Sequence, residues 1–227
     1  MGIDPLRRTW PERAGRALLG PYFAIAHRLD WTGVERVPTE GPAILAANHQ
    51  SFLDPPAVGL AVSRRIVFLA ARFYYSLPVL GQAMRLMQAV PVRADAPGHR
   101  PLTDMLRALE DGCLVGIFPE GARSPDGLLA AAHHGVGTLA LRSGAPVVPV
   151  TVSGGHDAWP MGRLLPRSAR IRLYFGEPFT ARGPSSRSRR REVTREVMLR
   201  IADGFTMLGR PAIARASRRR VAARLAG

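Results

Sequence analysis

Short apolar runs alternate with amphipathic stretches along most of the chain. The runs have the length and composition of strands buried on both faces of a sheet, and they lie at 43–47, 66–70, 114–118 and 147–152. Between them, residues 100–111 repeat apolar side chains at the three- and four-residue spacing of one helix face. Strands that alternate with helices predict an α/β domain, with a largely parallel sheet flanked by helices.

Weaker patterns complete this plan. Residues 31–37 and 170–175 have the character of edge strands, and residues 89–93 that of a short strand. Residues 79–87 and 136–142 show helical periodicity. These elements fit the same α/β domain.

Composition divides the chain into three parts. We expect an N-terminal membrane-interface helical segment over 1–30, an α/β domain over 31–181, and a basic C-terminal helix and tail over 182–227. The last part holds 13 arginines against three acidic residues, which is +10 of the chain's +15. Within it, residues 189–208 carry apolar side chains four apart and predict an amphipathic helix packed on the core. Residues 215–225 form either a basic helix end or a disordered tail, drawn to an anionic membrane surface or simply solvated.

The N-terminal segment contains an apolar stretch at 17–26. It is about half as long as the ~20 residues that span a bilayer, and it contains Pro21, so we expect neither a transmembrane helix nor a cleaved signal peptide. The arginines and aromatic side chains around it are typical of an anchor lying in the membrane interface. The alternative is a helix packed on the domain, and the two descriptions are compatible.

The charge balance points to anionic partners. The chain has 32 basic and 17 acidic residues, for a net charge of +15, and every basic residue is arginine. Arginine forms bidentate hydrogen bonds with phosphate, so phospholipid head groups, coenzyme phosphates and nucleic acid are all candidates. The absence of lysine has a simpler explanation in genome base composition. The single cysteine, Cys113, excludes an internal disulfide and has the setting of a small buried hydrophobe; no metal site is expected.

His49 and Asp54 are the first candidates for chemistry. His49 follows the run at 43–47 and therefore lies at a strand end, where open α/β sheets bind their ligands. Residues five apart on one helix are rotated by about 140°, so the two side chains meet only if the chain turns between them. Asp54 before Pro55 has the pattern of a helix N-cap followed by proline at the first helical position, which supplies that turn.

The turn gives the pair a chemical use. One carboxylate oxygen of Asp54 would cap the helix, while the other accepts a hydrogen bond from a ring nitrogen of His49. The second ring nitrogen would then be free to take a proton from a substrate hydroxyl. The alternative is that Asp54 is only a cap and His49 an ordinary strand-end histidine, which is the more common situation for an isolated pair.

A second polar segment, 118–124, leaves the apolar run at 114–118. Gly121 lets a ligand approach the backbone closely, Arg123 can bind a phosphate through two parallel donors, and Ser124 adds a hydroxyl donor. Glu120 cannot bind a phosphate directly, and we expect it to orient Arg123 or a substrate hydroxyl. By itself, a loop of this kind is a common exposed turn.

Together these segments resemble the motifs of the glycerolipid acyltransferase family, the group that includes the 1-acylglycerol-3-phosphate acyltransferases. The His-x4-Asp box at 49–54 is similar to the family's first motif, and 120–124 is similar to its Glu-Gly-Thr-Arg-Ser box. Residues 89–93 resemble an apolar run that ends in an acceptor-binding arginine, here Arg93, and 147–150 resemble the closing Val-Pro-Val motif. The four matches occur in the family's order.

Some positions depart from the family pattern. Ala122 stands in the threonine position of the second box, which removes one hydroxyl contact. His133 and His134 stand where relatives commonly have two lysines, so a titratable cation replaces a permanent one. Arg72 occupies the place of another lysine. The resemblance makes Arg72 and His134 candidates for additional substrate contacts.

The resemblance implies transfer of a fatty acyl group from an acyl-CoA or acyl carrier protein thioester to the hydroxyl of a lysophospholipid. The expected acceptor is 1-acylglycerol-3-phosphate and the expected product phosphatidic acid. His49, oriented by Asp54, would act as general base, without a cofactor. The acceptor phosphate would be held by Arg93 and by Gly121, Arg123 and Ser124 of the second box, with Glu120 of the same box orienting Arg123 or a substrate hydroxyl. The expected location is peripheral, on an anionic membrane surface at the cytoplasmic face.

Other interpretations remain open at this point. Glycerol-3-phosphate or an amino-acid lysolipid could be the acceptor. A basic nucleic-acid-binding protein is a more remote alternative, because the arginines cluster in the tail and the central domain lacks a helix-turn-helix or aromatic RNA-binding signature. We therefore expect no nucleic acid partner. A non-catalytic lipid-binding relative is disfavoured by the intact His49 and Asp54.

Overall fold

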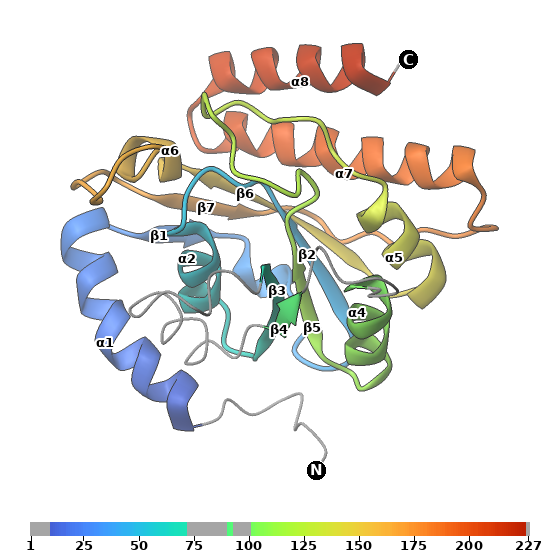
Figure 1. Cartoon of the computed structure of the whole chain (residues 1–227), viewed down its shortest axis with the longest axis horizontal. Helices are drawn as coiled ribbons and strands as arrows, with labels where there is room; N and C mark the ends of the chain where they lie inside the picture. Colours follow the sequence, from blue (N-terminus) through green and yellow to red (C-terminus); the bar gives the residue numbers. More distant parts are fainter. Residues whose placement is uncertain (1–9, 72–89, 93–100, 226–227) are drawn as a thin grey trace.

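The structure is a computed structural model and describes residues 10–71, 90–92 and 101–225 (Figure 1). Its elements in chain order are α1 (Trp10–His27), β1 (Asp30–Thr32), η1 (Val34–Arg36), β2 (Ala43–Ala47), α2 (Asp54–Ala61), β3 (Ile66–Ala71), β4 (Val90–Val92), α4 (Pro101–Glu110), β5 (Leu114–Ile117), α5 (Gly135–Ser143), β6 (Val147–Ser153), α6 (Gly155–Ala158), β7 (Arg172–Phe175), α7 (Arg187–Met207) and α8 (Pro211–Leu225).

The strands form a seven-stranded sheet in the order β1-β7-β6-β2-β5-β3-β4. Neighbouring strands are parallel except for β6 and β7, which are antiparallel. β2 lies inside the sheet between β6 and β5, and all its residues are buried. The predicted α/β class with a largely parallel sheet is confirmed.

Alternate residues of β2 face two separate cores, as the two-residue period of a strand requires. Leu45 and Ala47 belong to the cluster that contains Phe23 of α1 and the buried residues of α2. Ile44 and Ala46 belong to the cluster built with α4, α5, α7 and α8. Figure 1 shows α7 and α8 stacked on the side of the sheet away from α1 and α2. Both faces of the strand are therefore covered, which is why its sequence is apolar throughout.

Two predicted strands differ in detail. Residues 170–175 were expected at an edge, but β7 is covered on its outer side by β1, so the edge prediction is wrong. β7 has a neighbour on each side, because it pairs antiparallel with β6 and parallel with β1. Residues 31–37 form only the short β1, followed by the single helical turn η1. The helix expected at 79–87 lies outside the described residues.

The two ends of the chain are helical. Residues 215–225 lie in α8, which confirms the helical alternative over the disordered tail. At the other end, α1 buries Phe23 against the sheet. Arg16 of α1 donates to the carbonyl oxygens of Gly59 and Leu60 at the end of α2, at 2.5 and 2.8 Å. Within the described part of the chain, no helix combines the length and apolarity that crossing a bilayer requires.

Candidate active site

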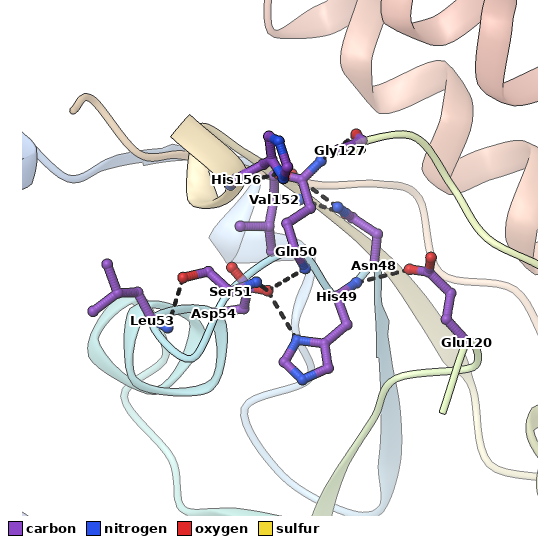
Figure 2. Close-up of polar contacts among 10 residues, drawn as sticks. All are labelled: Asn48, His49, Gln50, Ser51, Leu53, Asp54, Glu120, Gly127, Val152 and His156. Carbon is purple, nitrogen blue, oxygen red and sulfur yellow. Dashed lines mark hydrogen bonds and ion pairs between the residues drawn. The ribbon is translucent and has the colours of Figure 1, made fainter. Parts of the chain in front are cut away.

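The site begins where β2 ends. The side-chain amide of Asn48 continues the pairing between β2 and β6: its Nδ2 donates to the carbonyl of Val152 at 2.9 Å, and its Oδ1 accepts from the same residue's N–H at 2.7 Å (Figure 2). Asn48 is fully buried. The amide thus acts as one more peptide unit of the ladder and fixes the point at which the chain turns away to His49.

The predicted contact between His49 and Asp54 is present. Nδ1 of His49 lies 2.9 Å from Oδ2 of Asp54. The same oxygen accepts the backbone N–H groups of Gln50 at 2.5 Å and Ser51 at 2.7 Å. Because the aspartate is fully buried, these three charge-assisted bonds carry the stabilisation of its charge. One oxygen atom therefore sets both the turn and the orientation of the imidazole.

The predicted helix-capping role of Asp54 is wrong. Asp54 is the first residue of α2, and Leu53 precedes the helix as N-cap without a side-chain hydrogen bond. A capping carboxylate would need the N–H of the second or third helical residue. Pro56 has none, and the N–H of Ala57 donates to the carbonyl of Leu53 at 3.0 Å. With no donor ahead of it, the carboxylate points back into the preceding turn.

Among the described residues, one nitrogen of the His49 imidazole has no hydrogen-bond partner. A carboxylate can only accept, so the contact with Asp54 places the proton of neutral His49 on Nδ1 and leaves Nε2 as a base. No described residue hydrogen-bonds to Nε2. The ring stacks on Phe118, with centroids 4.2 Å apart, and Phe118 stacks in turn on Phe68 at 5.9 Å. The His49 side chain is 18% exposed, so it is held by packing and still open to a substrate.

Gln50 and Gly155 are part of the site but were not predicted from the sequence. Nε2 of Gln50 donates to the carbonyl of Gly127 at 2.6 Å, and its Oε1 accepts from the N–H of His156 in α6. A Cβ atom at Gly155 would lie 2.4 Å from Oδ1 of Asp54. Glycine is therefore required at 155 for α6 to pack against the turn. The Gly154-Gly155 pair in the sequence gives no signal for this contact.

Glu120 does not orient Arg123, contrary to our expectation. Its Oε1 accepts the backbone N–H of His49 at 2.8 Å, and its Oε2 accepts the N–H of Ala130 at 2.6 Å. The residue is 5% exposed, so it is closed to a substrate phosphate. Burial raises the pKa of Glu120 to about 7; the two backbone hydrogen bonds oppose the rise, and the nearby charge of Asp54 adds to it.

Ser124 also acts on the backbone of His49. Its N–H donates to the carbonyl of His49 at 2.7 Å. Its hydroxyl, predicted as a phosphate donor, instead donates to the carbonyl of Leu128 at 2.6 Å and is buried. Glu120 and Ser124 therefore hold both polar groups of the His49 backbone. The hydroxyl is occupied because the loop needs it to close its own turn.

Arg123 lies against the His-x4-Asp turn. Its guanidinium carbon is 3.6 Å from the centre of the Phe52 ring, a cation–π contact that leaves the in-plane N–H donors at the rim. Gly121 has a φ of +69°, and a Cβ there would lie 2.8 Å from the ring of His133. These contacts bring the two polar segments together, as the sequence predicted.

Of the other three candidate residues, only His134 lies in the described part of the chain, and none of the contacts above involves it. His134 is exposed at the start of α5. Partial desolvation lowers the pKa of His134, and the charges of Arg191, Arg187 and Arg190 at the start of α7 lower it further. Arg72 and Arg93 lie outside the described residues.

The C-terminal helix supports the loop that carries Arg123. Arg220 of α8 forms two hydrogen bonds with the carboxylate of Asp126, at 2.7 and 3.1 Å, and holds the pKa of Asp126 well below its usual range. The buried hydroxyl of Ser217 accepts the N–H of Leu129. The partners are 94 and 88 residues apart, so no local pattern could reveal them. Part of the basic tail therefore has a structural role.

Comparison with known proteins finds relatives of this chain. A model of the Acyltransferase family matches residues 28–153. The chloroplastic 1-acyl-sn-glycerol-3-phosphate acyltransferase LPAT1 of Arabidopsis thaliana is 32% identical over 163 residues, 70% of this chain and 46% of that protein. The 1-acyl-sn-glycerol-3-phosphate acyltransferase of Bacillus subtilis is 26% identical over 145 residues, 63% of this chain and 70% of that protein.

Similarity extends to a solved structure. The crystal structure of the 1-acyl-sn-glycerophosphate (LPA) acyltransferase PlsC from Thermotoga maritima matches with a TM-score of 0.71 and 28% identity, over 88% of this chain and 78% of that one. The chain spans about half the length, or less, of the first curated relatives it matches.

The raised pKa of Glu120 predicts a pH-dependent stability. In the unfolded chain the carboxyl titrates near 4.5, and in the folded protein at about 7. Between these values the unfolded state binds fewer protons than the native state, so this group makes the free energy of unfolding fall as pH rises. The Glu120→Gln variant has no carboxyl at this position and therefore lacks this pH-dependent contribution to the free energy of unfolding. We expect the wild-type value minus the variant value, from urea denaturation, to fall by roughly 3 kcal/mol between about pH 4 and pH 8.

The exposed Glu35→Gln variant is the control for loss of a surface carboxyl. A difference between wild type and Glu120→Gln that stays constant across this pH range would contradict the buried, proton-retaining Glu120.

Proposed function

Because the chain belongs to the Acyltransferase family, we propose that it transfers a fatty acyl group from an acyl-CoA or acyl carrier protein thioester to the hydroxyl of a lysophospholipid. The acceptor is 1-acylglycerol-3-phosphate and the product is phosphatidic acid. The names of the similar proteins from Arabidopsis thaliana, Bacillus subtilis and Thermotoga maritima support this choice of acceptor. The observation that carries the proposal is the 2.9 Å contact between Nδ1 of His49 and Asp54, which turns Nε2 away from the carboxylate and leaves it without a partner among the described residues.

The chemical step follows from this geometry. Nε2 of His49 takes the proton of the acceptor hydroxyl while the oxygen attacks the thioester carbonyl carbon. The new C–O bond forms, the C–S bond breaks, and the imidazolium returns the proton to the departing thiolate. Asp54 stabilises the imidazolium through Nδ1 and stays ionised. General base catalysis of this kind contributes about 10²- to 10⁴-fold in rate.

The step needs no nucleophilic side chain, because a thioester is already an activated acyl group. The hydroxyl oxygen of Ser51 accepts the N–H of Leu53 at 3.2 Å, and the hydroxyl of Ser124 donates to Leu128. Both serines are buried. Cys113 is buried too, at the start of β5. A direct transfer is the simplest use of the groups that the site presents.

Arg123 is the proposed ligand of the acceptor phosphate. Its stacking on Phe52 presents a fork of N–H donors beside the turn, and a guanidinium fork matches the oxygens of a phosphate. Arg93 is proposed as a second phosphate ligand, and Arg72 and His134 as further substrate contacts. We further propose that the protein works as a peripheral protein on the cytoplasmic face of a membrane, where its lipid acceptor resides.

The central test is thiol release by the purified protein with an acyl-CoA and a panel of acceptors, including lysophosphatidic acid and glycerol-3-phosphate. We expect His49→Ala to lower kcat by about 10²-fold or more, while its circular dichroism spectrum shows that the variant is still folded. His133→Ala, which removes an exposed histidine outside the turn, is the matched control. Near-normal thiol release by His49→Ala would rule out the mechanism.

The role of Arg123 has a separate test. We expect Arg123→Ala to raise KM for lysophosphatidic acid by about 10- to 100-fold, the value of a charge-assisted hydrogen bond to phosphate, with a smaller effect on kcat. For monoacylglycerol, which lacks the phosphate, the change in KM should be slight. Arg142→Ala removes an exposed arginine of α5 and controls for net charge. Equal changes in KM for the two acceptors would show that Arg123 does not bind the phosphate.

A further inference from the structure

The outward face of α1 is apolar. Trp10, Leu18 and Ile25 are 78, 72 and 80% exposed, and at 100° per residue they lie on one stripe together with the exposed Ala17 and Pro21. The opposite side of the helix packs on the sheet. An exposed apolar stripe of this length on a protein with a net charge of +15 indicates a surface that meets another apolar phase.

A second exposed apolar group lies in the loop at 160–167. Leu164 and Leu165 are 86 and 69% exposed, and Met161 is 49% exposed. The loop is closed at its base, because the N–H of Arg167 donates to the carbonyl of Ala158 at 2.9 Å. The two leucines are therefore held outward by an ordered turn.

The loop and α1 meet. The hydroxyl of Ser168 donates to the carbonyl of Ala26 at 2.8 Å, and the N–H of Ile171 donates to the carbonyl of His27 at 2.9 Å. Figure 1 shows the loop beyond α6 beside the C-terminal end of α1. The loop therefore lies next to the C-terminal end of α1. We refer to the exposed apolar residues of the two segments together as the docking face, namely Trp10, Leu18, Ile25, Met161, Leu164 and Leu165.

Arginines border this face where the loop joins α1. Arg28, Arg163 and Arg167 are exposed, and residues 159–171 contain no acidic side chain. Exposed leucines and tryptophan beside arginines are the composition that enters the interface of an anionic bilayer, each basic residue adding about tenfold or less to the partitioning. A purely apolar protein partner would give the arginines no role.

The docking loop is connected to the active site. Trp159, where the loop begins, packs on Phe52 with ring centroids 5.5 Å apart. Nε1 of Trp159 donates to the carbonyl of Arg163 within the loop, at 2.8 Å. Phe52 also carries the guanidinium of Arg123. One aromatic side chain of the His-x4-Asp turn therefore touches both the loop and the proposed phosphate ligand.

We propose that the docking face inserts into the surface of an anionic phospholipid bilayer, with the 160–167 loop as a second contact beside α1. Two separate contacts would fix the orientation of the domain, where a single helix would leave it free to rotate about its own axis. Arg123 is then held next to the lipid surface. The inference rests on the proposed function, since a lysophospholipid acceptor must reach His49 from a lipid phase.

The test is co-sedimentation of the full chain with vesicles of phosphatidylcholine mixed with phosphatidylglycerol, beside pure phosphatidylcholine vesicles. We expect Leu164→Asp/Leu165→Asp to weaken partitioning to the anionic vesicles by about tenfold or more. The control is Ala222→Asp/Ala223→Asp, which adds the same charges on exposed positions of α8. Because α8 packs on the other core of the sheet, we expect this control to lose less than about threefold.

Three outcomes would overturn the proposal. Unchanged partitioning of the loop variant would show that the loop does not touch the bilayer. An equal loss in the α8 control would assign the contact to the basic C-terminal helix. If analytical ultracentrifugation shows a dimer for the wild type and a monomer for the loop variant, the docking face is an interface between two copies of the chain. Thiol release by wild-type protein with a dispersed acceptor is measured in parallel, because its failure would contradict the proposed function and leave the binding result to be judged separately.

Discussion

A single carboxylate oxygen organises the centre of this protein. Oδ2 of Asp54 accepts two backbone N–H groups and the imidazole of His49, in a place with no access to water. A buried negative charge is tolerated only where donors surround it. Loss of the carboxylate would leave the two N–H groups unsatisfied and the ring unoriented at once. The turn, the base and its tautomer therefore depend on the same atom.

The surrounding fold keeps this arrangement in register. Asn48 extends the β2–β6 ladder to the start of the turn, and Glu120 and Ser124 bind the two polar groups of the His49 backbone. The loop that supplies them is tied to α8 through Arg220 and Asp126. Enzymes gain rate from groups that are already placed when the substrate arrives. A central strand, the loop that follows β5 and the last helix together position one histidine.

The strands and the contact between His49 and Asp54 could be predicted from sequence, because local apolar runs and a proline-marked turn determine them. The roles of Glu120 and Ser124 could not, since a side chain that binds a distant peptide group leaves no pattern in the sequence. The prediction that Asp54 caps the helix was wrong, because Pro56 lacks the N–H group that a cap would need. Arg220 looked like one of many tail arginines until the fold brought it to Asp126.

The tautomer of His49, which Asp54 is expected to fix with the proton on Nδ1, can be measured directly. Long-range proton–nitrogen NMR correlation on protein with ¹⁵N-labelled histidine distinguishes the two tautomers, and the His49→Ala spectrum identifies the signal. At a pH where the ring is neutral, we expect a proton on Nδ1 and a bare Nε2, with the preference lost in Asp54→Ala. A proton on Nε2 in the wild-type protein, or the same tautomer in both proteins, would contradict it.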